Sequence, residues 1–209
     1  MKWSGGAWLY GAFYHAAFSG QLKRTGRASN RTLRQLWREY TRVFGRAGEI
    51  GPSRLLSSYV MAAYFIAANR TTNLTPEENY ALFEAGLRGS RLFRLALGNA
   101  DAYLDERRLP GRMQWSKETH QRNYENEWVV DILTKTGEYA LGYNYWQCGI
   151  CKLCEDEKCF PLAQYLCRLD FVLADIMGMN LQRTGTLAEG AACCDFRYSK
   201  KMAGNGPPD

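Results

Sequence analysis

The seven cysteines of this 209-residue chain all lie between Cys148 and Cys194. Thiolates are strong nucleophiles and soft metal ligands, and the chain has only two histidines that could share such work. We therefore expect the chemistry of the protein to reside in residues 143–198, while the residues before them shape a pocket.

Four of these cysteines have nearly the spacing of a metal-cluster motif. Cys148, Cys151 and Cys154 are each three residues apart, and Cys159 follows, directly before a Phe-Pro pair. The run differs by one residue from the bacterial ferredoxin motif. Its intervening residues favour a helix, on which the first three thiols would form a stripe rather than surround a metal. A site without metal is the preferred prediction.

Cys148 lies where a predicted strand gives way to this helix. Unpaired N–H groups and the helix dipole at such a junction lower the pKa of a thiol, which makes Cys148 a candidate nucleophile. Cys167 and Asp170, three residues apart on the next predicted helix, face the same way. Taken alone, Cys167 is best interpreted as a small buried hydrophobic residue.

The last predicted hairpin is rich in polar groups. In its second strand, strict alternation sets Cys194, Phe196 and Tyr198 on the face opposite Asp195 and Arg197. Its first strand supplies further polar side chains, which are Arg183, Thr184 and Thr186. Arginine binds a carboxylate through two parallel hydrogen bonds. We therefore expect the arginines to bind a carboxylate ligand, and cross-strand Arg–Asp pairing within the hairpin is the alternative.

The elements around these residues follow from periodicity and from helix-breaking residues. In the C-terminal half, two β-rich runs at 128–133 and 139–145 predict a hairpin. Helices are predicted over 148–157 and 160–177, and a second hairpin pairs 179–187 with 193–198. The order ββ-αα-ββ predicts an antiparallel sheet with helices on one face.

The first 114 residues are predicted to be helical. The expected helices cover 3–19, 30–45 with Asn30 as its cap, a buried helix from Ser53, and 76–104 with one break near 86–89. A capping box of Thr75 and Glu78 begins the last of these. Pro110 and Gly111 indicate a loop, and 116–126 is expected to be irregular.

These patterns together predict an α+β fold. It consists of a helical N-terminal region (1–114) packed on a small antiparallel sheet within an α+β region of catalytic type (115–199). The Gly- and Pro-rich residues 200–209 predict a disordered tail.

Charge and cysteine usage limit the partners. The net charge is +6, and Arg34, Arg38, Arg42 and Arg46 follow one another at helical spacing. They could bind phosphates, but no nucleic-acid motif surrounds them, so a solvated face is preferred. No apolar run is long enough to span a membrane. An odd number of crowded cysteines predicts reduced thiols and a cytoplasmic protein.

Five segments, in this order and spacing, resemble the L-2-amino-thiazoline-4-carboxylic acid hydrolase family. They are NEWVV at 126–130, QCGICKL at 147–153, YLCRLD at 165–170, LQRTGTLAEG at 181–190 and CDFRY at 194–198. The resemblance covers about residues 115–199. It implies hydrolytic opening of a cyclic amidine that carries a carboxylate, a step of bacterial cysteine formation.

The positions that match these motifs include the residues that could carry such a reaction. We expect Cys194 or Cys148 to supply a thiolate, or a carboxylate to activate water, with Asp170 or Asp195 as proton carrier. The expected substrate-binding residues are Arg183, Arg197, Thr184, Thr186, Glu189 and Cys167.

The expected partner is a small carboxylate substrate, without a cofactor, nucleic acid or membrane, and a homo-oligomer is left open. The alternative function is a non-catalytic small-ligand module or a thiol-based metal or redox sensor.

Overall fold

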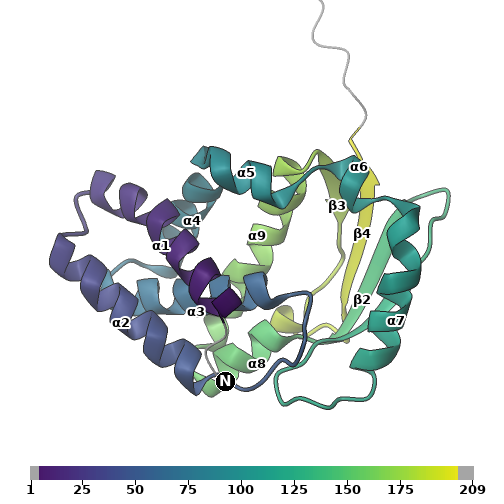
Figure 1. Ribbon diagram of the computed structural model, residues 1–209, viewed down its shortest axis with the longest axis horizontal. Helices are drawn as coiled ribbons and strands as arrows, with labels where there is room; N and C mark the ends of the chain where they lie inside the picture. Colours follow the sequence, from purple (N-terminus) through teal and green to yellow (C-terminus); the bar gives the residue numbers. More distant parts are fainter. Residues whose placement is uncertain (1–4, 202–209) are drawn as a thin grey trace, which may run out of the picture.

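In a computed structural model of the protein, residues 5–201 are described, and they form a helical bundle and a four-stranded antiparallel sheet (Figure 1). In this view the bundle α1–α4 lies on the left, strands β2, β3 and β4 on the right, and α9 between them. The architecture is α+β, as predicted.

The described helices of the N-terminal part are α1 (Gly5–Arg24), α2 (Asn30–Arg46), α3 (Leu56–Thr71), α4 (Pro76–Gly89), α5 (Arg91–Leu97), α6 (Ala100–Tyr103) and α7 (Leu109–Thr119). The elements that follow are β1 (Val129–Leu133), β2 (Leu141–Gln147), α8 (Gly149–Asp156), α9 (Ala163–Ile176), β3 (Met179–Gln182) and β4 (Cys194–Lys200).

The helix starts differ from the predictions at two places. Ser29, not Asn30, caps α2, because Ser29 and Thr32 each accept a hydrogen bond from the other's backbone N–H. Helix α3 starts after Ser53, whose hydroxyl oxygen instead accepts a hydrogen bond from the Leu55 N–H at 3.0 Å. The predicted capping box of α4 is confirmed.

The segment between α4 and β1 is more helical than predicted. The break after Gly89 is confirmed, and Gly98, with φ of 84°, adds a second break. The loop predicted at Pro110 is wrong, because this residue lies in the first turn of α7, where a missing N–H costs nothing. The irregular segment therefore starts after Thr119. Helix α1 extends beyond the predicted 3–19, whose first two residues lie outside the described residues.

The sheet has the strand order β1-β2-β4-β3, and every neighbouring pair is antiparallel. The first predicted hairpin is confirmed as β1 and β2. In the central pair, Tyr143 lies opposite Phe196 and Tyr145 lies opposite Cys194. These four side chains share the face that turns toward α9 and the bundle, so this face of the sheet is the inner wall of the molecule.

The second predicted hairpin is shorter than expected. Strand β3 ends at Gln182, and residues 183–193 form a loop with a single 3-10 turn at Leu187–Glu189. The N–H groups of Thr184 and Gly185 bond the Asp195 carboxylate instead of continuing the ladder. Strand β4 runs to Lys200, so the predicted disordered tail is wrong at that residue, and its part from 202 on lies outside the described residues.

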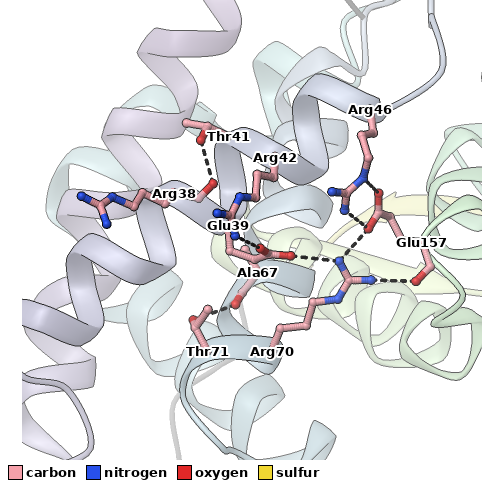
Figure 2. A network of polar contacts seen from close by, with 9 residues as sticks. All are labelled: Arg38, Glu39, Thr41, Arg42, Arg46, Ala67, Arg70, Thr71 and Glu157. Atoms are coloured by element: carbon pink, nitrogen blue, oxygen red, sulfur yellow. Dashed lines mark hydrogen bonds and ion pairs between the residues drawn. The ribbon is translucent and has the colours of Figure 1, made fainter.

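A buried carboxylate fastens the bundle to α8. Glu157, the residue after α8, is hydrogen-bonded by Arg46 of α2 at 2.8 and 3.1 Å and by Arg70 of α3 at 2.6 Å (Figure 2). Arg46 is thus not part of a purely solvated arginine face. One hydrophobic core runs from the bundle into α8 and α9, while the division at residue 114 stays a prediction. Within the described part of the chain, no helix is both long and apolar enough to cross a bilayer.

Candidate active site

A cavity of about 210 Å³ lies between the inner face of the sheet and α9. Four of the predicted site residues line it, namely Cys148, Cys167, Asp170 and Cys194. The rest of its wall is mostly apolar and aromatic and includes Leu55, Ser58, Leu97, Tyr103, Trp128, Tyr145, Leu166, Leu173, Phe196 and Tyr198. A small-molecule site commonly has this character, an apolar container with few polar groups.

Cys148 occupies the junction predicted for it, after β2 and directly before the first turn of α8. The thiol of Cys151 lowers the pKa of Cys148, and the backbone N–H groups of Cys151 and Ile150 act in the same direction, against the effect of burial. The dipole of α8 adds to this stabilisation of a thiolate. Of the thiols in the cavity wall, Cys148 is therefore the one prepared to ionise.

The position of Cys148 depends on close packing at the start of α8. A Cβ atom on Gly149 would collide with the backbone oxygen of Asn126 and lie 2.9 Å from the Trp128 ring. Asn126 in turn donates hydrogen bonds to the Tyr59 hydroxyl of α3 and to the Asp156 carboxylate of α8, both at 2.9 Å. Glycine is thus required for this approach of helix to strand.

Asp170 faces the cavity from α9 with Arg183 beside it. The Arg183 Nη1 group donates to the Asp170 carboxylate at 3.0 Å and to the Cys167 carbonyl oxygen at 3.2 Å. Burial raises the pKa of Asp170 from 3.8 to about 7, although Arg183 lowers it. A carboxyl group that is half protonated near neutral pH can both donate and accept a proton.

Arg183 itself is nearly buried, since its side chain is only 6% exposed. Its guanidinium lies 4.8 Å from the ring centre of Phe171 and 5.1 Å from that of Phe196. Phe196 lines the cavity and Arg183 does not, so the arginine lies behind the wall. It is the cation in direct contact with Asp170.

The other two thiols of the wall are held in their neutral form. Burial raises the pKa of Cys194 to about 12, although the Leu187 N–H lies 3.2 Å from its sulfur and donates to it. Burial also raises the pKa of Cys167. Neither thiol has the lowered pKa found at Cys148.

Two further predicted residues support the loop that carries Leu187. The hydroxyl of Thr186, which is fully buried, donates to the Glu189 carboxylate at 2.7 Å. The pair closes the turn that aims the Leu187 N–H at Cys194. Neither Thr186 nor Glu189 lines the cavity itself.

Of the remaining predicted residues, Asp195 and Arg197 lie on the outer face of β4, as strand alternation required, and Thr184 lies in the loop beside Asp195. Asp195 accepts hydrogen bonds from Thr184 Oγ1 at 2.7 Å and from the backbone of the same loop. Arg197 donates to the carbonyl oxygens of Tyr143 and Phe196. The described structure therefore does not bring Asp195, Thr184 and Arg197 to the cavity. Of the residues expected to act together with Cys194 on one substrate, those on the inner side of the sheet reach the cavity.

The aromatic wall was not among the sequence predictions. Tyr103 and Tyr198 meet edge to face at 5.4 Å, and Tyr145 and Phe196 at 5.3 Å. The alternation of Tyr143 and Tyr145 in a predicted strand signalled that both would share one face. No local pattern signalled that Tyr103, which precedes the sheet by a whole helix, would join them.

The ferredoxin-like cysteine run lies on α8 and in the turn that follows it. Cys151 and Cys154 are buried within α8, and a hydrogen bond to a neighbouring thiol raises the pKa of each, with burial acting in the same direction. Over residues 5–201, no three His, Cys, Asp or Glu side chains are grouped so that they could hold a metal ion.

Comparison with known proteins adds a family to this geometry. The family model described as L-2-amino-thiazoline-4-carboxylic acid hydrolase matches residues 53–198, from just before α3 to within β4. Neither curated proteins nor solved structures gave a match. The matched range contains every residue that lines the cavity. The chain belongs to the L-2-amino-thiazoline-4-carboxylic acid hydrolase family.

Proposed function

We propose that the protein is a hydrolase that opens the ring of a cyclic amidine carrying a carboxylate, of the 2-amino-thiazoline-4-carboxylate type. The observation that carries this proposal is that Cys148, whose pKa is lowered, and Asp170, whose pKa is about 7, face the same small cavity. A nucleophile and a proton carrier in one enclosed site are the two groups that such a reaction requires.

The reaction begins with attack of the Cys148 thiolate on the ring carbon that is bonded to sulfur and two nitrogens. Protonated Asp170 then donates its proton to the ring nitrogen, which leaves as an amine when the ring carbon–nitrogen bond breaks. The Asp170 carboxylate next removes a proton from a water molecule that adds to the same carbon. The bond to Cys148 breaks last, and the thiolate is regenerated.

Arg183 attracts the substrate carboxylate by its charge from behind the cavity wall. While Asp170 is protonated, the guanidinium charge has no compensating carboxylate at 3.0 Å, and it attracts an anionic ligand into the cavity. The aromatic wall holds the flat ring by apolar contact. Binding of the carboxylate and protonation of Asp170 therefore favour each other.

The decisive experiment is Cys148→Ser assayed with L-2-amino-thiazoline-4-carboxylate. We expect turnover to fall by roughly a thousandfold or more, because a hydroxyl at this position stays protonated. The melting temperature should be almost unchanged, since the two side chains have nearly the same shape. Ring opening is followed by mass spectrometry of the product.

Cys194→Ser is the matched control from the same cavity wall. Its thiol is already neutral, so this variant should keep ring opening within a few-fold of the wild-type rate. Retention of the rate in both variants would exclude Cys148 and Cys194 as the nucleophile and would favour water activated by Asp170 as the mechanism. Loss of activity in Cys194→Ser alone would assign the nucleophile to Cys194.

A further inference from the structure

Cys151 is a thiol that the proposed reaction does not use. It lies three residues after Cys148, at the third position of α8, and is 7% exposed. Its S–H group is the largest influence that lowers the pKa of Cys148. Since Cys148 is the residue directly before α8 and Cys151 is the third residue of that helix, their side chains are neighbours across its first turn.

The backbone allows these sulfurs to approach further. Residues three apart on a helix lie side by side, with about 5–6 Å between their Cβ atoms. A disulfide needs Cα atoms about 4.4–6.8 Å apart and somewhat closer Cβ atoms. Cys148 has an extended backbone, with φ of −122° and ψ of 118°. Cys148 thus has the backbone of a residue that precedes a helix, and rotation about its Cα–Cβ bond can turn its sulfur toward Cys151.

We propose that Cys148 and Cys151 are a dithiol–disulfide pair, and that a peroxide entering the cavity converts them reversibly into an intramolecular disulfide. This modification site goes beyond the proposed hydrolysis. It depends on the two thiols alone and would stand even if another group opened the ring.

The chemistry is balanced with hydrogen peroxide as the oxidant. The Cys148 thiolate attacks one peroxide oxygen, the O–O bond breaks, and a sulfenic acid and, after protonation, one water molecule form. The sulfur of Cys151 then attacks the Cys148 sulfur, and the sulfenic oxygen leaves as a second water. The two thiols lose two protons and two electrons in total, and the peroxide takes them up to give two waters.

Access and burial assign the two roles. Cys148 lines the cavity, into which a molecule as small as peroxide fits, and Cys151 does not line it. Cys167 and Cys194 share the cavity but come from α9 and β4. Neither is among the groups that hydrogen-bond the Cys148 sulfur. Cys148 is thus the thiol that is oxidised first and Cys151 the thiol that resolves it.

The sequence makes the test direct. Trypsin cleaves after Lys135 and after Lys152, and the peptide of residues 136–152 contains Cys148 and Cys151 and no other cysteine. The folded protein is treated with hydrogen peroxide, its remaining thiols are alkylated, and the digest is analysed by mass spectrometry. We expect this peptide to lack both alkyl groups and to be two hydrogens lighter than its dithiol form. Dithiothreitol should restore alkylation.

Two variants distinguish the pair from other thiols. Cys151→Ser should prevent the internal disulfide and leave a sulfenic acid at Cys148, which dimedone traps. Cys167→Ser removes another thiol of the cavity and should leave the internal disulfide unchanged. A disulfide that joins peptide 136–152 to the peptide carrying Cys167 or Cys194 would overturn the proposal. So would persistence of both thiols while other cysteines of the chain are oxidised. Because no substrate is used, these results are independent of the ring-opening assay.

Discussion

Asp170 is subject to two opposing influences that decide its charge. Burial disfavours the carboxylate, and Arg183 at 3.0 Å favours it, with burial the larger effect. About a third of its side-chain surface (33%) stays accessible, and Asp170 lines the cavity. The carboxyl is therefore neutral in a large fraction of molecules near pH 7, as a proton donor to a leaving amine must be.

The raised pKa of Asp170 predicts a pH-dependent stability difference. Its folded-state pKa, about 7, exceeds the ordinary value of 3.8. Protonation thus favours the folded state, and this contribution is lost as pH rises from about 4 to 7. Asp170→Asn removes the titration. Between pH 5 and pH 8 the wild type therefore loses stability that the variant keeps. The free energy of unfolding of the variant minus that of wild type should rise over this range by an amount on the order of 2 kcal/mol, after allowance for solvent in the cavity.

Urea unfolding at both pH values measures this difference, and Asp195→Asn provides its control. Burial acts to raise the pKa of Asp195, but hydrogen bonds from Thr184 and the neighbouring backbone outweigh burial, so the pKa lies below its ordinary value. Asp195 is therefore ionised in both states from pH 5 to 8, and its variant should differ from wild type by a constant amount. A constant difference for Asp170→Asn as well would mean that Asp170 is already ionised at pH 5.

At the scale of elements, the start of α8 is set by contact rather than by helix propensity. Gly149→Ala would add a Cβ against the Asn126 carbonyl and the Trp128 ring. Because a backbone atom cannot yield as a flexible side chain does, the helix start must move and carry Cys148 with it. We expect a loss of about 1–3 kcal/mol in the free energy of unfolding and a several-fold loss of ring opening.

The matched control is Gly137→Ala, where an added Cβ would meet nothing within 4 Å. It should change neither the urea midpoint nor the rate appreciably. If Gly149→Ala behaved like this control, the close approach of α8 to Asn126 would not matter for the position of the nucleophile.

The sequence predicted those elements whose periodicity reflects local packing. The β1–β2 hairpin, the buried helix α3 and the strand-to-helix junction at Cys148 all have a clear pattern. The loop after Gln182 does not, because the backbone N–H groups of Thr184 and Gly185 are bonded by the side chain of Asp195, which lies 11 and 10 residues further on. The loop predicted at Pro110 is wrong because proline both breaks helices and begins them.

The candidate site was predictable only on the sheet and on the two helices between its hairpins. Alternation correctly separated Cys194 from Asp195, and helical spacing correctly paired Cys167 with Asp170. The contributions of Leu55, Leu97 and Tyr103 come from the helical region far away in sequence. They depend on how the bundle packs on the sheet, which no local pattern encodes.

At the scale of the whole molecule, the bundle and the cysteine-bearing helix behave as one packed body. The large core cluster includes Tyr59 and Phe65 of α3 together with Leu153 of α8 and Leu166 of α9. The family match also begins before α3, well within the helical part. The bundle thus helps to fix α8, and with it Cys148, against the cavity.

The Glu157 contact tests this coupling. Burial raises the pKa of Glu157, but hydrogen bonds from Arg46 and Arg70 outweigh burial and hold the pKa below 4.5 (Figure 2). Its side chain is only 5% exposed. Glu157→Gln should therefore lower the free energy of unfolding at pH 7 by about 2 kcal/mol, the range of a charge-assisted hydrogen bond. Since the folded pKa is depressed, this contribution is present above pH 4.5 and is lost as pH falls through the folded pKa. The difference from wild type, measured by urea unfolding, should thus shrink between pH 7 and pH 3.5.

The control is Glu77→Gln, which breaks an exposed pair with Arg168 and should have almost no effect at pH 7. An equal difference at both pH values would show that Glu157 acts by its shape and not by its charge.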